Sequence, residues 1–324
     1  MILFKRAGDL AGWLEQQRVA GRTIGFVPTM GALHTGHISL IDISKKSTSL
    51  TVCSIFINPT QFNDPKDFQK YPVTIEKDIF LLEKAGTDVL FLPERAELYP
   101  GGTANLEKYD LGALETILEG KYRPGHFQGV CQVMRRLLDL VRPDHLFMGQ
   151  KDYQQCMVVR RLLELMGSVT QLHPCPIVRE ADGLAMSSRN LRLTEAERAK
   201  ASAIYRALTL LKEGGAALVL KEGEAALAVK QEGAALAVKE GGEGWPALVA
   251  GARAILEEAG FRIDYVEIAD AKTLAPVLGE GGTLVNERGL TVKDGAPGGE
   301  RGHGMVALIA AFLGEIRLID NMII

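Results

Sequence analysis

The chain lacks the features that mark secreted, membrane-spanning or nucleic-acid-binding proteins. Its four cysteines are scattered without Cys-x-x-Cys spacing, which argues against a zinc site or a disulfide framework and predicts a cytoplasmic protein. No apolar run reaches the roughly 18 residues that a membrane span needs. The first ten residues, MILFKRAGDL, do not have the pattern of a signal peptide. Because the net charge is −3, no general basic field is available for nucleic acid. We therefore expect neither nucleic acid nor a membrane as a partner.

What the chain does have, over residues 1–176, is an alternation of strand-like and helix-like segments. The expected strands are 23–27, 50–58, 88–92 and 145–148, and the expected helices are 37–47, 75–85, 129–141 and 153–166. This alternation predicts an α/β fold, a Rossmann-like doubly wound parallel sheet. Ligands of such sheets bind at the carboxyl ends of the strands.

The pattern changes near residue 177, and we expect a smaller α+β C-terminal domain over 177–324. Its expected helices are 198–211 and 245–260, and its expected strands are 265–269 and 305–313. Two segments of this domain read as insertions. The first, at about 212–242, contains a repeat of nine residues (AALVLKEGE, AALAVKQEG, AALAVKEGG). The second, 279–304, is rich in glycine and has a hairpin signal at Arg288–Gly289.

The stretch FVPTMGALHTGH at 26–37 places two histidines at the start of an expected helix. With Thr35 as the N-cap, His34 and His37 would share one helix face. Both imidazoles would then lie beside the free N–H groups and the positive end of the helix dipole, which suits a phosphate. A His-x-x-His pair alone fits a simple turn or a zinc site as well. Its place after a buried strand favours phosphate binding.

A second polar motif, Met186-Ser187-Ser188-Arg189, offers two hydroxyls and a guanidinium in a short loop. Such a loop can close over phosphates and supply positive charge as pyrophosphate leaves. Together with His-x-Gly-His, it resembles the two signatures of the nucleotidyltransferase superfamily that includes class I aminoacyl-tRNA synthetases. The members of that superfamily attack the α-phosphate of a nucleoside triphosphate.

Several further motifs, in order along the chain, make the resemblance more specific. They are PTMGALHTGH at 28–37, SIFINPTQF at 54–62, RPGHFQGV at 123–130, GQKDYQQ at 149–155, READGLAMSSRN at 179–190 and RLIDN at 317–321. With these motifs the chain resembles the pantothenate synthetases, or pantoate–β-alanine ligases. The resemblance covers nearly all of residues 1–206 and returns at about 245–278 and 305–321.

The resemblance implies an ATP-dependent ligase of pantothenate biosynthesis. Pantoate's carboxylate attacks the α-phosphate of ATP, which gives pantoyl adenylate and pyrophosphate, and the amine of β-alanine then expels AMP. Magnesium is implied as a cofactor, held mainly by the phosphates and water. Asp78 is a weaker candidate ligand for it, and we assign no protein residue to the metal. A homodimer is implied as well.

The same resemblance assigns roles to individual residues. The catalytic set is His34, His37, Lys151 and Arg189; His37 donates a hydrogen bond or proton to the developing charge, and Lys151 bridges phosphate and the pantoate carboxylate. Gln61 binds pantoate and β-alanine, and Gln155 binds pantoate. The ATP-binding set is Met30, Gly31, Ala32, Leu33, His34, Thr35, Gly36, His37, Gly149, Gln150, Lys151, Asp152, Val178, Met186, Ser187, Ser188 and Arg189.

Two alternatives stay open at this point. The chain could be another nucleotidyltransferase acting on a small phosphorylated substrate, or a non-catalytic nucleotide-binding regulator. Gln61 and Gln155 argue against the first, because a phosphorylated acceptor favours Arg or Lys over paired amides. The second is disfavoured because a regulator would not need all of the charge-stabilising residues His34, His37, Lys151 and Arg189. One departure from the family is Val73, which stands where an arginine is common. Arg123, in the motif RPGHF, fits a role in the site and a role in a structural turn equally well.

Overall fold

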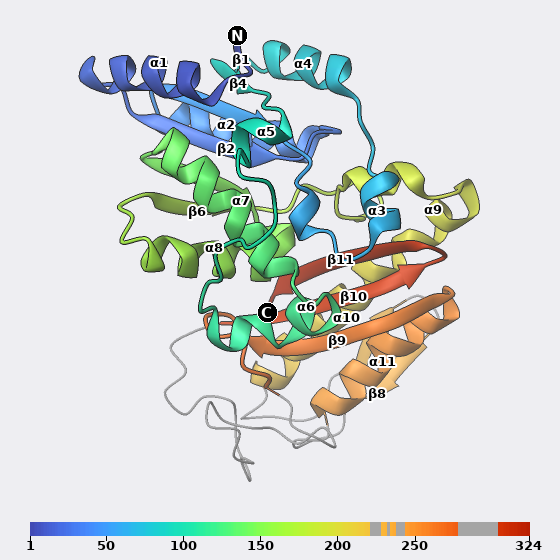
Figure 1. Ribbon diagram of the computed structural model, residues 1–324. Coiled ribbons are helices and arrows are strands. Elements are labelled where there is room, and N and C mark those ends of the chain that lie inside the picture. The colour runs from blue at the N-terminus through green and yellow to red at the C-terminus, as the bar shows by residue number, and fades with distance from the viewer. Residues whose placement is uncertain (221–227, 232–233, 238–243, 278–303) are drawn as a thin grey trace. The chain divides into compact units, whose positions relative to one another are not determined.

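The computed structural model describes residues 1–220, 228–231, 234–237, 244–277 and 304–324 (Figure 1). It divides into two compact units. The first comprises Met1–Val178 and Met186–Leu191, and the second comprises Arg179–Ala185 and Arg192–Ile324. The hairpin expected at Arg288–Gly289 lies outside the described residues. No helix in the described part of the chain is long and apolar enough to cross a membrane.

The first unit is built on a six-stranded parallel sheet with the strand order β1-β4-β3-β2-β5-β6. The strands are β1 (Ile2–Phe4), β2 (Ile24–Thr29), β3 (Leu50–Ile55), β4 (Val89–Phe91), β5 (His145–Gly149) and β6 (Gln171–Cys175). From β2 the chain winds outward through β3 and β4, and it then returns to the other side of β2 with β5. A crevice for ligands is expected where the winding reverses, at the carboxyl ends of β2 and β5.

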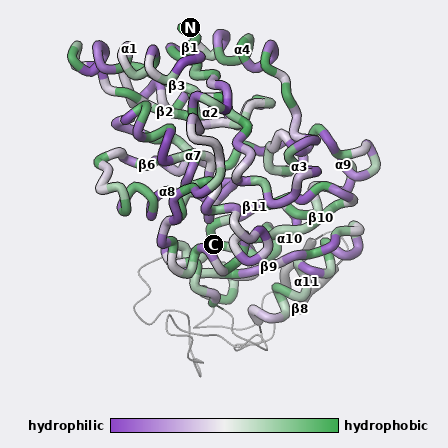
Figure 2. Tube along the Cα trace, viewed as in Figure 1, coloured by the Kyte–Doolittle hydropathy of each residue, from purple (hydrophilic) through white to green (hydrophobic). Residues whose placement is uncertain are grey.

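Helices cover both faces of this sheet (Figure 1). One face packs on α1 (Ala7–Val19), α7 (His126–Val141) and α8 (Tyr153–Leu165), and the other packs on α2 (Thr35–Ser47) and α4 (Ile75–Lys84). Successive strand residues serve the two cores in turn, because side chains alternate across a strand: Phe26 faces the first core and Val27 the second. Figure 2 shows hydrophobic and hydrophilic residues mixed along the helices, as expected for helices with one buried side. The predicted doubly wound α/β fold is confirmed.

Short elements follow several strands and carry part of the site. They are the 3-10 turns η1 (Pro59–Gln61), η2 (Gly112–Glu115), η3 (Gln150–Asp152) and η4 (Ser188–Arg192), and the helices α3 (Pro65–Gln69), α5 (Arg95–Leu98) and α6 (Leu118–Tyr122). The strand expected at 50–58 ends at Ile55, and Asn58 at the end of the expected range is the N-cap of η1. The helix expected from residue 129 already begins at His126, after Gly125 in the left-handed region (φ 80°).

The second unit packs helices on an antiparallel sheet of order β11-β10-β9. Its elements are α9 (Glu195–Ala201), α10 (Ala203–Leu220), α11 (Gly244–Glu258), β9 (Phe261–Asp270), β10 (Met305–Leu313) and β11 (Ile316–Ile323). A separate antiparallel pair joins β7 (Ala228–Gln231) to β8 (Ala234–Ala237). The smaller α+β domain has the predicted class.

Further boundaries differ from expectation between residues 186 and 220. The helix expected at 198–211 is two helices, α9 and α10, and α10 continues to Leu220, so that the first part of the segment expected as an insertion, 212–220, is helical. Gly214 and Gly215 lie inside α10 facing α11: a Cβ on Gly214 would lie 2.3 Å from Leu248 Cδ2. Their helix-weakening effect is offset because their small size permits close packing. Finally, Met186–Leu191 groups with the first unit, although it was assigned to the C-terminal domain.

Candidate functional site

A strained turn joins β2 to α2 at the switch point of the sheet. Gly31 and Ala32 both have positive φ angles, 83° and 48°. The buried carboxylate of Asp78 holds this turn: it accepts hydrogen bonds from the N–H groups of Ala32 (2.9 Å) and Leu33 (2.8 Å). The Thr74 hydroxyl donates a third bond to the same carboxylate, at 3.0 Å. Because both of its oxygens bind the turn, Asp78 acts there as a structural anchor.

The two signature histidines cap α2 with their own side chains. His34, and not Thr35 as expected, is the N-cap: its Nδ1 accepts from the N–H of Gly36 at 3.2 Å. His37 Nδ1 in turn accepts from the N–H of His34 at 3.3 Å, which completes a capping box. Since a backbone N–H can only donate, both Nδ1 atoms are unprotonated, and each neutral ring carries its proton on Nε2. The prediction from sequence placed the cap at Thr35 because imidazole is an uncommon N-cap group.

Burial keeps both imidazoles neutral. Burial, with a smaller contribution from the positive charge of Lys151, lowers the pKa of His34 to about 4. Burial also lowers the pKa of His37 well below its ordinary value, with added contributions from His34 and Lys151. The ring centroids lie 4.0 Å apart. The pair therefore presents two neutral N–H donors near a lysine, which suits an anionic oxygen.

Lys151 and Gln155 come from the segment that follows the carboxyl end of β5. Gly149 ends the strand, η3 contains Lys151, and Gln155 lies in the first turn of α8. The Lys151 ammonium is 3.7 Å from the carboxylate of Asp152, and the lysine side chain is 16% exposed. Both arms of the switch point, after β2 and after β5, thus contribute polar groups to one place.

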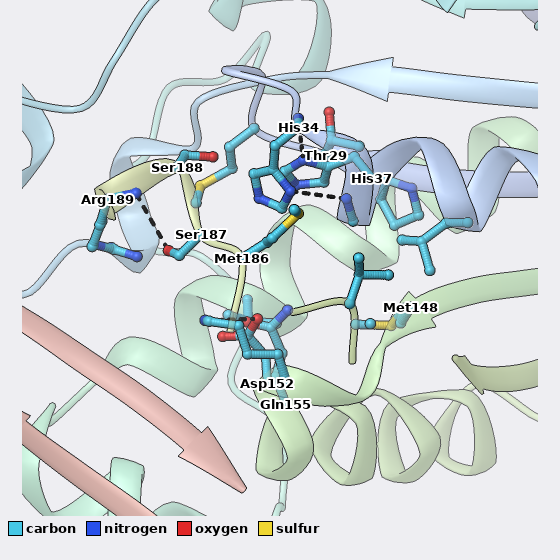
Figure 3. Close-up of a pocket in the computed structure, with 18 of the residues that line it drawn as sticks. Thr29, His34, His37, Met148, Asp152, Gln155, Met186, Ser187, Ser188 and Arg189 are labelled. Atoms are coloured by element: carbon cyan, nitrogen blue, oxygen red, sulfur yellow. Dashed lines mark hydrogen bonds and ion pairs between the residues drawn. The ribbon is translucent and has the colours of Figure 1, made fainter. Parts of the chain in front are cut away.

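The Met-Ser-Ser-Arg segment is tied to the same turn. Ser188, which is buried, donates its hydroxyl to the carbonyl of Ala32 at 2.9 Å, and the N–H of Met186 donates to Val178 at 3.0 Å. The Arg189 N–H donates to the Ser187 hydroxyl at 3.3 Å. Figure 3 shows Met186 directed toward His34 and His37.

These groups line one cavity of the first unit. The predicted site residues that line it are Met30, His34, Gly36, His37, Gln61, Gly149, Lys151, Asp152, Gln155, Val178, Met186, Ser187, Ser188 and Arg189. Five predicted residues do not line it: Gly31, Ala32, Leu33, Thr35 and Gln150. Ala32 and Leu33 are buried, so that their contribution is the backbone of the turn, and Thr35 is exposed.

Sequence reasoning missed the apolar wall of the cavity. Val130, Val133, Met134 and Leu137 of α7 line it at the i, i+3, i+4, i+7 spacing of one helix face. That spacing reads from the sequence as ordinary core, and no residue type distinguishes a wall from a core. Tyr71 also lines the cavity, whereas Val73 does not and is 66% exposed.

No group of three or more His, Cys, Asp or Glu side chains in the described part of the chain has the arrangement of a metal site. The charged side chains that line the cavity are the cations Lys151 and Arg189 and the carboxylate Asp152.

Comparison with known proteins identifies the family. The profile of the family described as Pantoate-beta-alanine ligase matches residues 2–323. The chain belongs to this ligase family. The pantothenate synthetase of Pseudomonas fluorescens is 39% identical over 322 residues, which are 99% of this chain and 97% of the relative. That of Bacteroides thetaiotaomicron is 37% identical over 319 residues, 97% and 95% of the two chains.

Solved structures of the family agree with the fold. The pantothenate synthetase from Thermus thermophilus superposes with a TM-score of 0.79 at 33% identity and covers 99% of both chains. The pantoate–β-alanine ligase from Francisella tularensis, complexed with β-γ ATP and β-alanine, gives a TM-score of 0.70 at 30% identity. That comparison covers 100% of this chain and 97% of the other. The family resemblance stated from the motifs is confirmed.

Proposed function

We propose that this chain condenses pantoate with β-alanine to form pantothenate, with ATP cleaved to AMP and pyrophosphate through a pantoyl adenylate. The observation that carries the proposal is one cavity, in a member of this ligase family, that is lined by two neutral histidines, Lys151 and Arg189. No side chain is needed as a covalent nucleophile, so the protein's work is positioning and charge stabilisation.

In the first step ATP lies with its phosphates at the start of α2. The Nε2–H donors of His34 and His37 meet phosphate oxygens there, beside the positive end of the helix dipole. His37 donates to the charge that develops on the α-phosphate, and Arg189 meets the pyrophosphate as it leaves. Adenine packs beside Met186, whose side chain lines the cavity.

Pantoate lies between the amides and the apolar wall. Gln61 and Gln155 bind its hydroxyl and carboxylate, since an amide both donates and accepts. Its two methyl groups face Val133 and Met134 on α7, both of which line the cavity. Lys151 sits where the carboxylate meets the α-phosphate and lowers the repulsion between the two anions.

In the second step the neutral amine of β-alanine attacks the acyl carbon of the adenylate. The bond from that carbon to the bridging oxygen breaks, AMP leaves with the bridging oxygen, and the new amide nitrogen releases a proton to solvent. Gln61 holds β-alanine. Magnesium is expected to arrive on ATP, bound by phosphate oxygens and water, and to neutralise charge on the departing pyrophosphate. The residues described above provide donors to the substrate's phosphates and no ready set of metal ligands.

The decisive assay is AMP formation with pantoate, β-alanine and ATP, each omitted in turn. Because activation precedes amide formation, the protein with ATP, magnesium and pantoate alone should exchange labelled pyrophosphate into ATP. An exchange that strictly requires β-alanine would contradict the two-step order. Exchange with a phosphorylated alcohol, and none with pantoate, would assign the chain to a different nucleotidyltransferase activity.

A cytoplasmic location and assembly as a homodimer belong to the same proposal, and both rest on the family resemblance. Sedimentation equilibrium of the purified full chain tests the assembly. A species of one chain mass across micromolar concentrations would argue against the dimer.

A further inference from the structure

A buried histidine outside the proposed reaction connects two site elements. His126, the first residue of α7, is 5% exposed. Its Nδ1 lies 2.8 Å from the backbone carbonyl oxygen of Gln61, and its Nε2 lies 3.0 Å from Arg123 Nη1. A carbonyl can only accept and a guanidinium can only donate. The proton is therefore on Nδ1, and Nε2 accepts from Arg123.

The backbone of η1 lies directly against the first turn of α7. A Cβ on Gly129 would lie 2.1 Å from the carbonyl oxygen of Thr60 and 2.6 Å from Cα of Gln61, so that only glycine fits there. The amide of Asn58 spans the same contact: its Nδ2 donates to the carbonyl of Gly129 at 3.0 Å. These contacts and the His126 bond hold the Gln61 backbone from two sides.

The same network sets the direction of the Gln61 side chain. Asn58 Nδ2 also donates to Gln61 Oε1, at 3.2 Å. The oxygen of the amide is thereby engaged, and its NH₂ group is directed to the sulfur of Met30, a cavity residue, at 3.0 Å. With its backbone and its oxygen both held, Gln61 presents N–H donors to the cavity.

We propose that His126 is a positioning residue for pantoate: with Arg123 behind it, its neutral imidazole fixes the Gln61 backbone so that the amide N–H groups meet the substrate's oxygens. This inference rests on the proposed function for the identity of the substrate. The role requires a donor on one edge of the ring and an acceptor on the other, and a neutral imidazole provides both. Burial, together with the charge of Arg123, lowers the pKa of His126 to about 3, so the ring stays neutral at physiological pH.

The test compares His126→Ala with His126→Asn, which keeps one N–H donor near the position of Nδ1. Steady-state kinetics of the full chain should show a pantoate KM raised about tenfold or more in His126→Ala, a smaller rise in His126→Asn, and an ATP KM within about twofold of wild type. Gln128→Ala is the matched control. Gln128 lies in the same turn of α7, but its amide bonds Tyr109 and Glu115 instead of η1.

A double-mutant cycle separates positioning from general damage. In a Gln61→Ala background the His126→Ala change should cost little further in pantoate KM, because the group that it positions is already gone. An undiminished cost in that background would overturn the inference, as would equal rises in the KM values for pantoate and ATP.

Hydrogen exchange provides a readout that needs no substrate. Peptides that cover residues 58–62 should exchange faster in His126→Ala, whereas those from α4 should match wild type. Unchanged exchange at 58–62 would refute the positioning of Gln61 by His126, even if pantoate is the substrate. Conversely, wild type could neither bind nor turn over pantoate while exchange at 58–62 still rises in His126→Ala. The proposed substrate would then be wrong, and the positioning of Gln61 by His126 would stand.

Discussion

Asp67 on α3 binds the guanidinium of Arg189, with Nη2 2.8 Å from Oδ2 and Nε 3.5 Å from Oδ1. The guanidinium also lies over the ring of Tyr71, 5.7 Å from its centroid. Burial opposes the charge on Arg189, but the hydrogen bond and charge of Asp67 outweigh it, so its pKa lies above the ordinary value. Arg189, which is proposed to meet the leaving pyrophosphate, is thus already paired with the carboxylate of Asp67. Phosphate oxygens must displace this carboxylate or share the guanidinium with it.

Replacing that carboxylate should strengthen nucleotide binding. In Asp67→Asn the triphosphate no longer competes with an anion for Arg189, so we expect the dissociation constant for ATP to fall about threefold to tenfold. Calorimetric titration with a non-hydrolysable ATP analogue measures it. Asp64→Asn is the control: it removes the same charge at the N-cap of α3, where asparagine also caps well. Weaker binding in Asp67→Asn would mean that Asp67 orients Arg189 for the phosphates.

Arg189→Lys should behave as a disruptive change. Two nitrogens of the guanidinium reach the Asp67 carboxylate, and lysine has no planar fork to reproduce this geometry. Adenylate formation in a single turnover at saturating ATP should slow by at least about tenfold. A wild-type rate would show that charge alone suffices.

Lys151→Ala should lower pyrophosphate exchange by about 10²–10³, the usual cost of removing one charge-stabilising donor. The effect should appear in the rate at saturating substrates more than in ATP binding, because the ammonium is proposed to act where two anions meet. Lys46→Ala, at an exposed position in the last turn of α2, is the matched control and should exchange at the wild-type rate. Equal losses in both variants would point to net charge instead of position.

Asp78→Ala should destabilise the fold and the phosphate site together. The change leaves the N–H groups of Ala32 and Leu33 without their acceptor in a buried turn, which costs about 2–5 kcal/mol of unfolding free energy. Thr74→Val removes only the hydroxyl bond to Asp78 and should cost about 1 kcal/mol. Urea unfolding compares the two variants. Similar costs would contradict the assignment of Asp78 as the anchor of the turn.

Stability should depend on pH through His126. Its folded pKa of about 3 lies below the ordinary 6.5, so the unfolded chain binds more protons between these values and stability falls as pH falls. Arg123 opposes a proton on the ring, whereas Glu119 and the Gln61 carbonyl favour one. The stability advantage of wild type over His126→Asn should shrink by about 2 kcal/mol from pH 7 to pH 5. A constant difference across this range would mean that the histidine is not buried in its neutral form.

Most of the first unit was predictable because its signals are local. Strands such as Val89–Phe91 are short apolar runs, and helices such as Ile75–Lys84 have a clear amphipathic pattern. The strands Ile2–Phe4 and Gln171–Cys175 were not predicted. Both occupy the edges of the sheet, where their exposed polar or terminal residues weaken the apolar signal.

The site shows a similar division. Motif residues such as His37 and Lys151 were predicted, because they follow expected strands and stand in motifs that resemble those of the family. The partners of other site residues were not predicted: Asp67 binds Arg189 across 122 residues of chain, and His126 binds the carbonyl of Gln61 across 65. Such long-range pairings leave no periodic trace in a single sequence.

The carbonyl of Ala32 accepts the hydroxyl of Ser188, although 156 residues separate them. Met186–Leu191 belongs to the first unit, but both its flanks, Arg179–Ala185 and the chain from Arg192, belong to the second. The chain therefore crosses between the two units three times, and a cut at residue 178 separates Met186–Arg189 from the rest of the cavity lining. Recombination at residue 178 would yield a chimera in which Met186–Leu191, with Arg189, comes from the other parent. Inheritance of this activity therefore requires that Met1–Val178 and Met186–Leu191 be transferred together.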